Sequence, residues 1–253
     1  MSAEFQYFDI VIMIITILYV IMVVLIGDFI QKKTNVVNFS RKFIHVFAGF
    51  SVLATFFLNW AWLTNIIAIL FVALIYLANP KSPIKFLRKM FNSMARDDEI
   101  KKGHIYGPLY YAISILLLTF IFTIPSLNLV QYYIFPASAL SIMYLGDGLA
   151  PIIGKKFGKK EFRLINGSIR TIPGTLTVLI AGFLGCFIML LSFGWFYYSL
   201  LSVLSVLILS IIGSVSASLI EMFSPKGLDN LTLPILTTII LGGIYYLTYM
   251  LGI

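Results

Sequence analysis

The sequence predicts an all-α integral membrane protein, a polytopic bundle of about eight transmembrane helices in one domain spanning residues 1–253. Hydrophobic residues make up 60% of the chain and charged residues only 11%, whereas an average soluble domain has roughly 25% charged residues. The apolar residues fall in runs long enough to cross a bilayer. This composition excludes a soluble globule and a disordered chain, and the single cysteine, Cys186, excludes an intramolecular disulfide.

The apolar runs place the predicted spans. We expect them at about residues 8–30, 43–59, 62–79, 108–125, 130–146, 172–193, 196–220 and 231–252. No Lys or Arg precedes the first run, so we expect a retained span rather than a cleaved signal peptide. Only Asn59-Trp60-Ala61 separates the second and third spans, which predicts a tight helical hairpin with aromatic anchors at the membrane interface.

The distribution of charge predicts the orientation. All 18 Lys and Arg residues lie in the connections after the first, third, fifth and seventh spans. Because basic residues favour the cytoplasmic side, both termini are expected to be non-cytoplasmic. Attraction to anionic lipid headgroups explains a net charge of +8 on one face, and an anionic substrate such as a nucleotide is the sharper alternative. Nucleic acid is not an expected partner, since the basic residues lie at membrane boundaries.

The densest group of polar residues follows the fifth span, at 146–160, where Asp147 lies between two glycines. Glycine allows backbone to approach a ligand closely, and exposed N–H groups with nearby lysines hold phosphate. An aspartate in such a loop suits Mg²⁺. A plain glycine-rich membrane turn with a lysine tail is an equally favoured interpretation. The phosphate-binding candidates are Gly146, Gly148, Gly154, Lys155, Lys156, Gly158 and Lys159.

A second polar group opens the sixth span. Pro173 suits the first turn of a helix. A helix N-terminus with a nearby arginine binds anions through its backbone donors and dipole, although a simple helix cap is the favoured alternative. The candidates are Asn166, Arg170, Thr171, Gly174 and Thr175.

Two further groups complete the polar face. Glu221 ends an apolar run, where an ionised carboxylate is costly without a partner or a metal ion. Asp229 and Asn230 precede the eighth span, and Asp229 is also a candidate helix cap.

At the start of the second span, Arg41 and His45 share one helix face, with Lys42 between them. A packing role for His45 is favoured over a catalytic one. Tyr110, near the start of the fourth span, is in the usual place of an interface anchor.

Taken together, these groups resemble the polyprenol kinase family, which comprises dolichol kinases, phytol kinases and CTP-dependent diacylglycerol kinases. The matching pieces, in the family's order, are R-K-x-x-H-x-x-x-G at 41–49, G-P-L-Y-Y at 107–111, G-D-G-x-A-x-x-x-G-x-x-x-G at 146–158, G-T at 174–175 and E…D-N-L-T at 221–232. In one departure, Arg170-Thr171 stands where the family usually has a Lys-Ser or Lys-Thr pair.

The resemblance implies a lipid kinase that transfers the terminal phosphate of CTP, or of ATP, to an isoprenoid alcohol such as phytol, geranylgeraniol, a polyprenol or dolichol. Mg²⁺ would be held by Asp147, Glu221 and Asp229. The lysines and Arg170 would neutralise phosphate, and Asn166 and Asn230 would orient ligand groups. The catalytic candidates are Asp147, His45 and Glu221, and Arg41, Lys42 and Tyr110 are on the acceptor side or structural. The base is left open between Asp147 and His45.

The expected site lies on the cytoplasmic face of a cell membrane, or of an endoplasmic-reticulum type membrane, and is formed by segments 31–45, 80–111, 146–175 and 221–232. A diacylglycerol kinase and a phosphatidate cytidylyltransferase are the closest rivals. A lipid transporter is the alternative outside enzymes, and the lack of an obvious mid-membrane charge argues against it.

Overall fold

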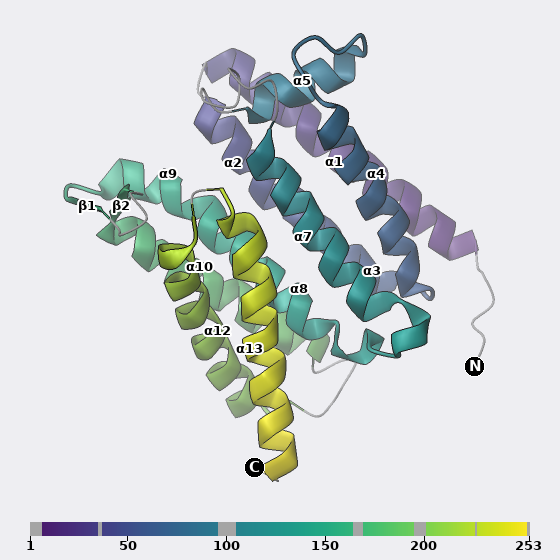
Figure 1. Cartoon of the computed structure of the whole chain (residues 1–253), viewed down its shortest axis with the longest axis vertical. Helices are drawn as coiled ribbons and strands as arrows, with labels where there is room; N and C mark the ends of the chain where they lie inside the picture. The colour runs from purple at the N-terminus through teal and green to yellow at the C-terminus, as the bar shows by residue number, and fades with distance from the viewer. Residues whose placement is uncertain are drawn as a thin grey trace. The chain divides into compact units, whose positions relative to one another are not determined.

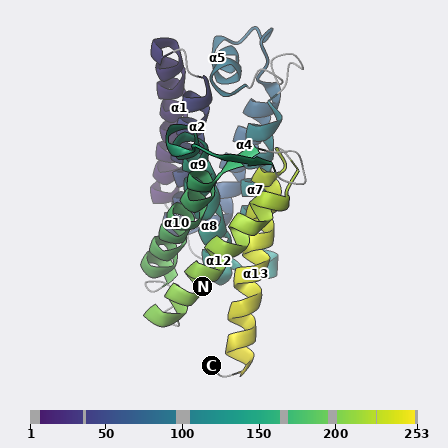
Figure 2. The same ribbon diagram turned by 90° about the vertical axis from the view of Figure 1, so that its left-hand side faces the viewer.

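The computed structural model describes residues 7–34, 37–95, 105–163, 169–194, 201–225 and 227–251, and it confirms the all-α membrane fold (Figures 1 and 2). The chain forms two compact units, Met1–Ser126 and Leu127–Ile253. The single transmembrane domain expected from the sequence stays a prediction.

The first unit packs around its N-terminal helix. In this unit α1 contacts α2 and α5, while α4 packs against α7. Its elements are α1 (Tyr7–Thr34), α2 (Val37–Gly49), η1 (Phe50–Leu53), α3 (Ala54–Phe57), η2 (Ala61–Leu63), α4 (Thr64–Leu77), α5 (Lys85–Met94) and α7 (Tyr106–Thr123), and η3 (Pro125–Leu127) lies at the boundary.

The second unit packs around α10, which contacts α8, α9 and α12, while α12 and α8 both contact α13. Its elements are η4 (Val130–Tyr132), α8 (Ile134–Ser141), η5 (Ile142–Asp147), α9 (Gly148–Phe157), β1 (Glu161–Arg163), β2 (Ile169–Thr171), α10 (Ile172–Met189), η6 (Leu190–Gly194), α12 (Val203–Phe223) and α13 (Asp229–Leu251).

Each predicted span coincides with helical structure. In the part of the chain that the structure describes, six helices are long and apolar enough to cross a membrane, and Ala61–Leu77 is a shorter apolar helix. The second predicted span, 43–59, falls on α2, η1 and α3, which follow one another with a tighter turn between them. The count of eight spans and the outward orientation of the termini stay predictions.

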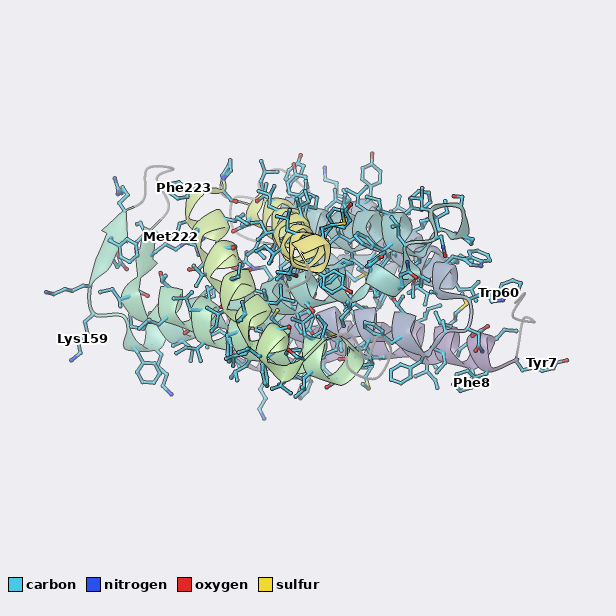
Figure 3. The ribbon with its side chains drawn as sticks, turned by 90° about the horizontal axis from the view of Figure 1, so that it is seen from below. Tyr7, Phe8, Trp60, Lys159, Met222 and Phe223 are labelled. Atoms are coloured by element: carbon cyan, nitrogen blue, oxygen red, sulfur yellow. The ribbon has the colours of Figure 1, made fainter. Side chains whose placement is uncertain are left out.

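The predicted hairpin between the second and third spans is present. Helix α3 ends at Phe57 and η2 begins at Ala61. The backbone N–H of Asn59 donates to Oδ1 of the buried Asp9 at 2.8 Å, which ties this corner to the start of α1. Trp60 therefore lies at the same end of the first unit as Tyr7 and Phe8 (Figure 3), as expected of aromatic residues at one membrane interface.

Helix α5 was not expected, because residues 80–107 read as a basic connection. Four of its five apolar side chains are buried in the core of the first unit, namely Leu87, Met90, Phe91 and Met94, and the partly buried Phe86 packs against that core. Ser40 Oγ donates to the carbonyl oxygens of Gly27 at 2.6 Å and Ser93 at 3.3 Å, so one buried hydroxyl joins α1, α2 and α5. The basic connection is thus partly an amphipathic helix packed on the bundle.

The predicted start of the seventh span, at Phe196, lies outside the described residues. Helix α12 begins at Val203, because Ser202 has extended backbone and its Oγ accepts the N–H of Ser205 at 3.1 Å. A serine N-cap satisfies an N–H group that the first turn of a helix leaves without a backbone partner. The helix continues to Phe223, so Glu221 belongs to its last turn.

The prediction of a loop directly after the fifth span is wrong. Residues Val130–Phe157 continue as one apolar helical segment through η4, α8, η5 and α9, and every residue of α8 is buried. Helix α9 begins at Gly148, so the amides of this glycine-rich segment are largely taken up in helical hydrogen bonds. Its glycines instead permit close helix packing. A Cβ added to Gly146 would lie 3.1 Å from the carbonyl oxygen of Val178 on α10.

The contact between α9 and the start of α10 is tighter still. A Cβ on Gly154 would lie 2.7 Å from Thr171 Oγ1 and 3.4 Å from the Cα of Gly174. Thr171 Oγ1 cannot move aside freely, because it accepts the N–H of Gly174 and caps α10. Gly154 therefore fixes how closely α9 approaches the N-terminus of α10.

We predict that Gly154→Ala destabilises the protein by about 1–3 kcal/mol, because the added methyl group overpacks this contact. The matched control is Gly243→Ala, where nothing lies within 4 Å of the added Cβ. Thermal unfolding in detergent measures both. A melting temperature for Gly154→Ala equal to that of the control would contradict the proposed packing role.

Candidate functional site

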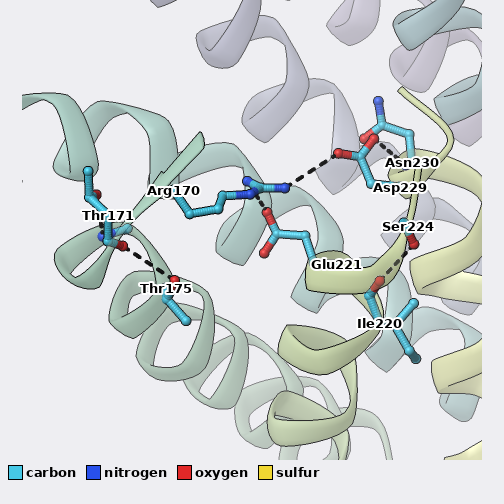
Figure 4. Close-up of polar contacts among 9 residues, drawn as sticks. Arg170, Thr171, Thr175, Ile220, Glu221, Ser224, Asp229 and Asn230 are labelled. Atoms are coloured by element: carbon cyan, nitrogen blue, oxygen red, sulfur yellow. Dashed lines mark hydrogen bonds and ion pairs between the residues drawn. The ribbon is translucent and has the colours of Figure 1, made fainter. Parts of the chain in front are cut away.

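The second unit contains a cluster of three charged residues, which we name the charged cluster: Arg170, Glu221 and Asp229. Arg170 Nη1 lies 2.5 Å from Glu221 Oε1, and its Nη2 lies 4.0 Å from Asp229 Oδ2. Figure 4 shows the guanidinium pointing between the two carboxylates. The side chain of Glu221 is 4% exposed, against 22% for Arg170 and 20% for Asp229. The guanidinium of Arg170 therefore faces a carboxylate that is almost fully removed from water.

The β1–β2 hairpin brings Arg170 to this position. The two strands are antiparallel, with Phe162 opposite Arg170 and Arg163 opposite Ile169. Paired residues share a face of the sheet and neighbours along a strand alternate. The side chain of Arg170 turns to the carboxylates, so Arg163 and Ile169 lie on the other face.

The N-terminus of α10 follows directly after Arg170. Thr171 has extended backbone, its Oγ1 accepts the N–H of Gly174 at 3.2 Å, and its carbonyl oxygen accepts from Thr175 Oγ1 at 3.3 Å (Figure 4). This confirms the prediction that this segment caps the helix, with Pro173 in the first turn. The N-terminal end of a helix carries roughly half a positive charge, so the helix end and Arg170 supply positive potential side by side.

Asp147 lies on the helical segment that packs against α10. It ends the π-helix η5 and is 5% exposed. Asp147, Ala150 and Gly154 are spaced three and four residues apart and share one face. Added Cβ atoms show that this face meets α10, since one on Gly174 would lie 3.3 Å from the carbonyl oxygen of Ala150. π-Helical turns occur frequently at functional sites.

The two carboxylates around Arg170 are the best candidates for a metal site. Mg²⁺ is usually held by one or two protein carboxylates plus substrate phosphates, and Glu221 and Asp229 converge from two helices on one cationic group. Within the described ranges, no three His, Cys, Asp or Glu side chains form a metal-ligand group. Asp147 as a third ligand therefore stays a prediction.

The other predicted phosphate ligands differ in their placement. Gly146, Gly148 and Gly154 lie in helical segments, and Gly158 packs against Thr171. Lys155, Lys156 and Lys159 have exposed side chains, and Lys159 points away from its unit in Figure 3. Asn166 lies outside the described residues. The backbone N–H of Asn230 donates to Asp229 Oδ1 at 3.0 Å, so Asn230 adjoins the charged cluster.

Four of the predicted residues, Arg41, Lys42, His45 and Tyr110, belong to the first unit. The rings of His45 and Tyr111 lie 4.5 Å apart, and the Tyr111 hydroxyl donates to the carbonyl oxygen of His45 at 2.9 Å. Tyr111 is thus a partner of His45, and the ring of Tyr110 contacts that of Tyr106. Arg41 and Lys42 lie on α2, one turn and three residues before His45. Their part in one site with Asp147 stays a prediction.

Sequence reasoning assigned no role to one pair of hydroxyl groups. Ser224 Oγ and Thr232 Oγ1 lie 2.6 Å apart and join the end of α12 to the start of α13. Ser224 Oγ also donates to the carbonyl oxygen of Ile220 at 2.7 Å (Figure 4). This pair closes the connection that carries Asp229. Only their spacing on either side of Asp229-Asn230 hints at it in the sequence.

Comparison with known proteins gives relatives of one kind. No protein-family model and no solved structure matches the chain. The chain is 33% identical over 199 residues to a phytol kinase from Synechocystis sp., covering 78% of this chain and 75% of that protein. It is 26% identical to a probable chloroplastic phytol kinase of Triticum aestivum, over 80% of this chain and 66% of the relative. A probable phytol kinase 1 of Glycine max is 28% identical and is matched over 48% of its length.

We predict that Arg170→Met destabilises the protein by about 3 kcal/mol, because it leaves the buried Glu221 carboxylate without its ionic partner. The double variant Arg170→Met with Glu221→Gln should regain more than half of this loss. Thermal unfolding of the two single variants and the double variant gives the coupling energy. Additive effects would contradict a stabilising pair.

Proposed function

The chain belongs to the phytol kinase family and is a membrane-embedded phosphotransferase, and from this premise we propose that it transfers the terminal phosphate of CTP to the hydroxyl group of an isoprenoid alcohol. The relatives are named as phytol kinases, and phytol is the acceptor that we propose first. The structural observation that supports the proposal is the charged cluster, where one arginine and two carboxylates adjoin a helix N-terminus.

Phosphate binding is proposed for Arg170 and the first turn of α10. A guanidinium has five donors and binds phosphate in a bidentate manner. Arg170 keeps 22% of its side chain exposed, so donors that do not face Glu221 are accessible to a ligand. The helix end adds backbone donors and the positive end of its dipole. Phosphoryl transfer depends mainly on such positioning and charge neutralisation.

Glu221 and Asp229 are the residues that we propose hold Mg²⁺, with phosphate oxygens completing its coordination. When bound, the ion neutralises negative charge on the triphosphate. Binding of Mg²⁺ would require Glu221 and Asp229 to interact with both the ion and Arg170. The 4.0 Å separation of Arg170 and Asp229 is longer than a hydrogen bond. The contact of Arg170 with Asp229 is therefore weaker than its contact with Glu221, and Asp229 loses less on turning to the ion.

Asp147 is the proposed base. The oxygen of the alcohol attacks the terminal phosphorus, the bond from that phosphorus to the bridging oxygen breaks, and the nucleoside diphosphate leaves. The hydroxyl proton passes to the carboxylate. Asp147 suits this step because it is 5% exposed within an apolar helical segment, where bulk water is scarce. His45, half-buried on α2, is the alternative base.

The cytoplasmic membrane face is proposed for the site, because all Lys and Arg residues follow odd-numbered predicted spans. We propose a cell membrane, or an endoplasmic-reticulum type membrane in a eukaryote. Diacylglycerol as acceptor and cytidylyl transfer to phosphatidate remain the rival reactions, and the names of the relatives favour the isoprenoid alcohol.

We predict that the purified protein in detergent with Mg²⁺ transfers label from γ-labelled CTP to phytol or geranylgeraniol. ATP as donor, and diacylglycerol and a polyprenol as acceptors, run in parallel. Label entering a lipid only from α-labelled CTP with phosphatidate would establish the cytidylyltransferase reaction instead. An absence of label with every pair would overturn the kinase proposal for this chain.

We further predict that Asp147→Asn and Glu221→Gln each lower kcat at least 100-fold, because one removes the proton acceptor and the other the proposed Mg²⁺ carboxylate. The matched control is Glu161→Gln, which neutralises an exposed carboxylate on the hairpin and should change kcat less than twofold. Steady-state kinetics with the labelled donor measures all three. An Asp147→Asn enzyme with wild-type kcat would transfer the role of base to His45.

A further inference from the structure

The end of α9 and the outer face of the β1–β2 hairpin carry basic and apolar side chains together. Phe157 is 56% exposed and Ile169 is 54% exposed. The neighbouring basic side chains are exposed as well. We name the basic–apolar surface by its members, Lys156, Phe157, Lys159, Lys160, Arg163 and Ile169.

The strand register separates this surface from the charged cluster. Arg170 and its partner Phe162 lie on the face of the hairpin turned to Glu221, whereas Arg163 and Ile169 pair on the opposite face. The apolar and basic side chains of the outer face therefore do not contribute to the compensation of the buried carboxylates. Within the strands, Glu161 is the one acidic residue on that outer face.

The composition of the basic–apolar surface matches the headgroup layer of a bilayer. Aromatic and aliphatic side chains that alternate with lysine are typical of segments lying in the membrane interface. Each Lys or Arg near an anionic surface gains about 1 kcal/mol, a factor of about five in partitioning. Lys156 Nζ lies over the ring of Phe157, 5.3 Å from the ring centre, so a positive charge and an aromatic ring occur together on this surface.

The position of the basic–apolar surface in the chain also places it at the headgroup layer of the bilayer. Strand β2 runs directly into α10, one of the helices long and apolar enough to cross the membrane. Ile172, the first residue of α10, is 59% exposed, so the apolar surface continues from the hairpin onto the helix. The hairpin therefore begins where the bilayer's hydrocarbon region is expected to end.

We propose that the basic–apolar surface docks on the anionic lipid headgroups of the bilayer in which the protein is embedded. The lysines contact lipid phosphates, and Phe157 and Ile169 insert between the headgroups. Because Arg170 lies on the other face of the same two strands, docking also holds the strand that carries Arg170. This inference does not depend on the proposed kinase reaction, and its test measures depth in the membrane rather than turnover.

The chain offers a clean way to test this proposal. Its one cysteine, Cys186, is buried, so a cysteine introduced by Ile169→Cys accepts a spin label selectively. The label's accessibility to a water-soluble nickel chelate and to oxygen reports its depth. We would measure it in nanodiscs of neutral phosphatidylcholine and in nanodiscs containing phosphatidylglycerol.

The expected result is at least threefold lower nickel accessibility in the anionic nanodiscs, with most of the difference lost at 1 M salt, where the Debye length falls to about 3 Å. The triple variant Lys156→Gln, Lys159→Gln and Lys160→Gln should abolish the difference. The matched control is Lys33→Gln, Lys81→Gln and Lys85→Gln, which removes three exposed lysines from the first unit and should retain it.

Three outcomes would overturn the proposal. Equal accessibility in neutral and anionic nanodiscs would show that lipid charge does not hold the surface. An equal loss of the accessibility difference in both triple variants would show that the effect depends on the net charge of the protein alone. Protection by inorganic triphosphate in neutral nanodiscs, equal to that by anionic lipid, would assign the lysines to the nucleotide instead.

Discussion

The contact between Arg170 and Glu221 is the constraint on which the second unit's polar end depends. A carboxylate that is 4% exposed in an apolar helix is costly, and a guanidinium 2.5 Å away offsets much of that cost. That pairing fixes the face of the hairpin, the strand that leads into α10 and the place of the connection before α13. The same pair gives the site its chemistry, since a buried acid and an adjacent fixed cation are what a phosphate and a divalent ion need.

The sequence predicted the helical spans better than the structure of the segments between them. Apolar runs mark membrane helices strongly, and each predicted span coincides with helical structure. Glu221 was singled out because a carboxylate at the end of an apolar run is costly, and Arg170 because an arginine beside a helix N-terminus binds anions. Asp229 was named as a helix cap and, through the resemblance, as a metal ligand, and the structure brings these three together. Their direct pairing was not predicted, because it depends on a short hairpin that leaves no clear periodic pattern.

The errors have a common physical origin. Residues 148–157 read as a loop because glycine normally weakens helices, yet here Gly154 permits a close approach to α10 that outweighs its poor helix propensity. Likewise, α5 read as a connection because it is too short and too basic to be a span, although its apolar face is buried on α1 and α2. Tertiary packing determined the helical structure of both segments. Such packing leaves only a weak signal in a single sequence.

The π-helix η5 has a consequence for how this chain tolerates change in length. A π-helical turn holds one residue more than an α-helical turn, so loss of one residue between Ile142 and Leu145 would leave a continuous, well-bonded α-helix. Because the π-turn fits this extra residue into about one turn, the side chains after it would keep roughly their present direction relative to α8. Asp147, Ala150 and Gly154 would still face α10. Loss of one residue from the regular helix α8 would instead rotate all three by about 100°, so this segment tolerates a deletion in η5 better than one in α8.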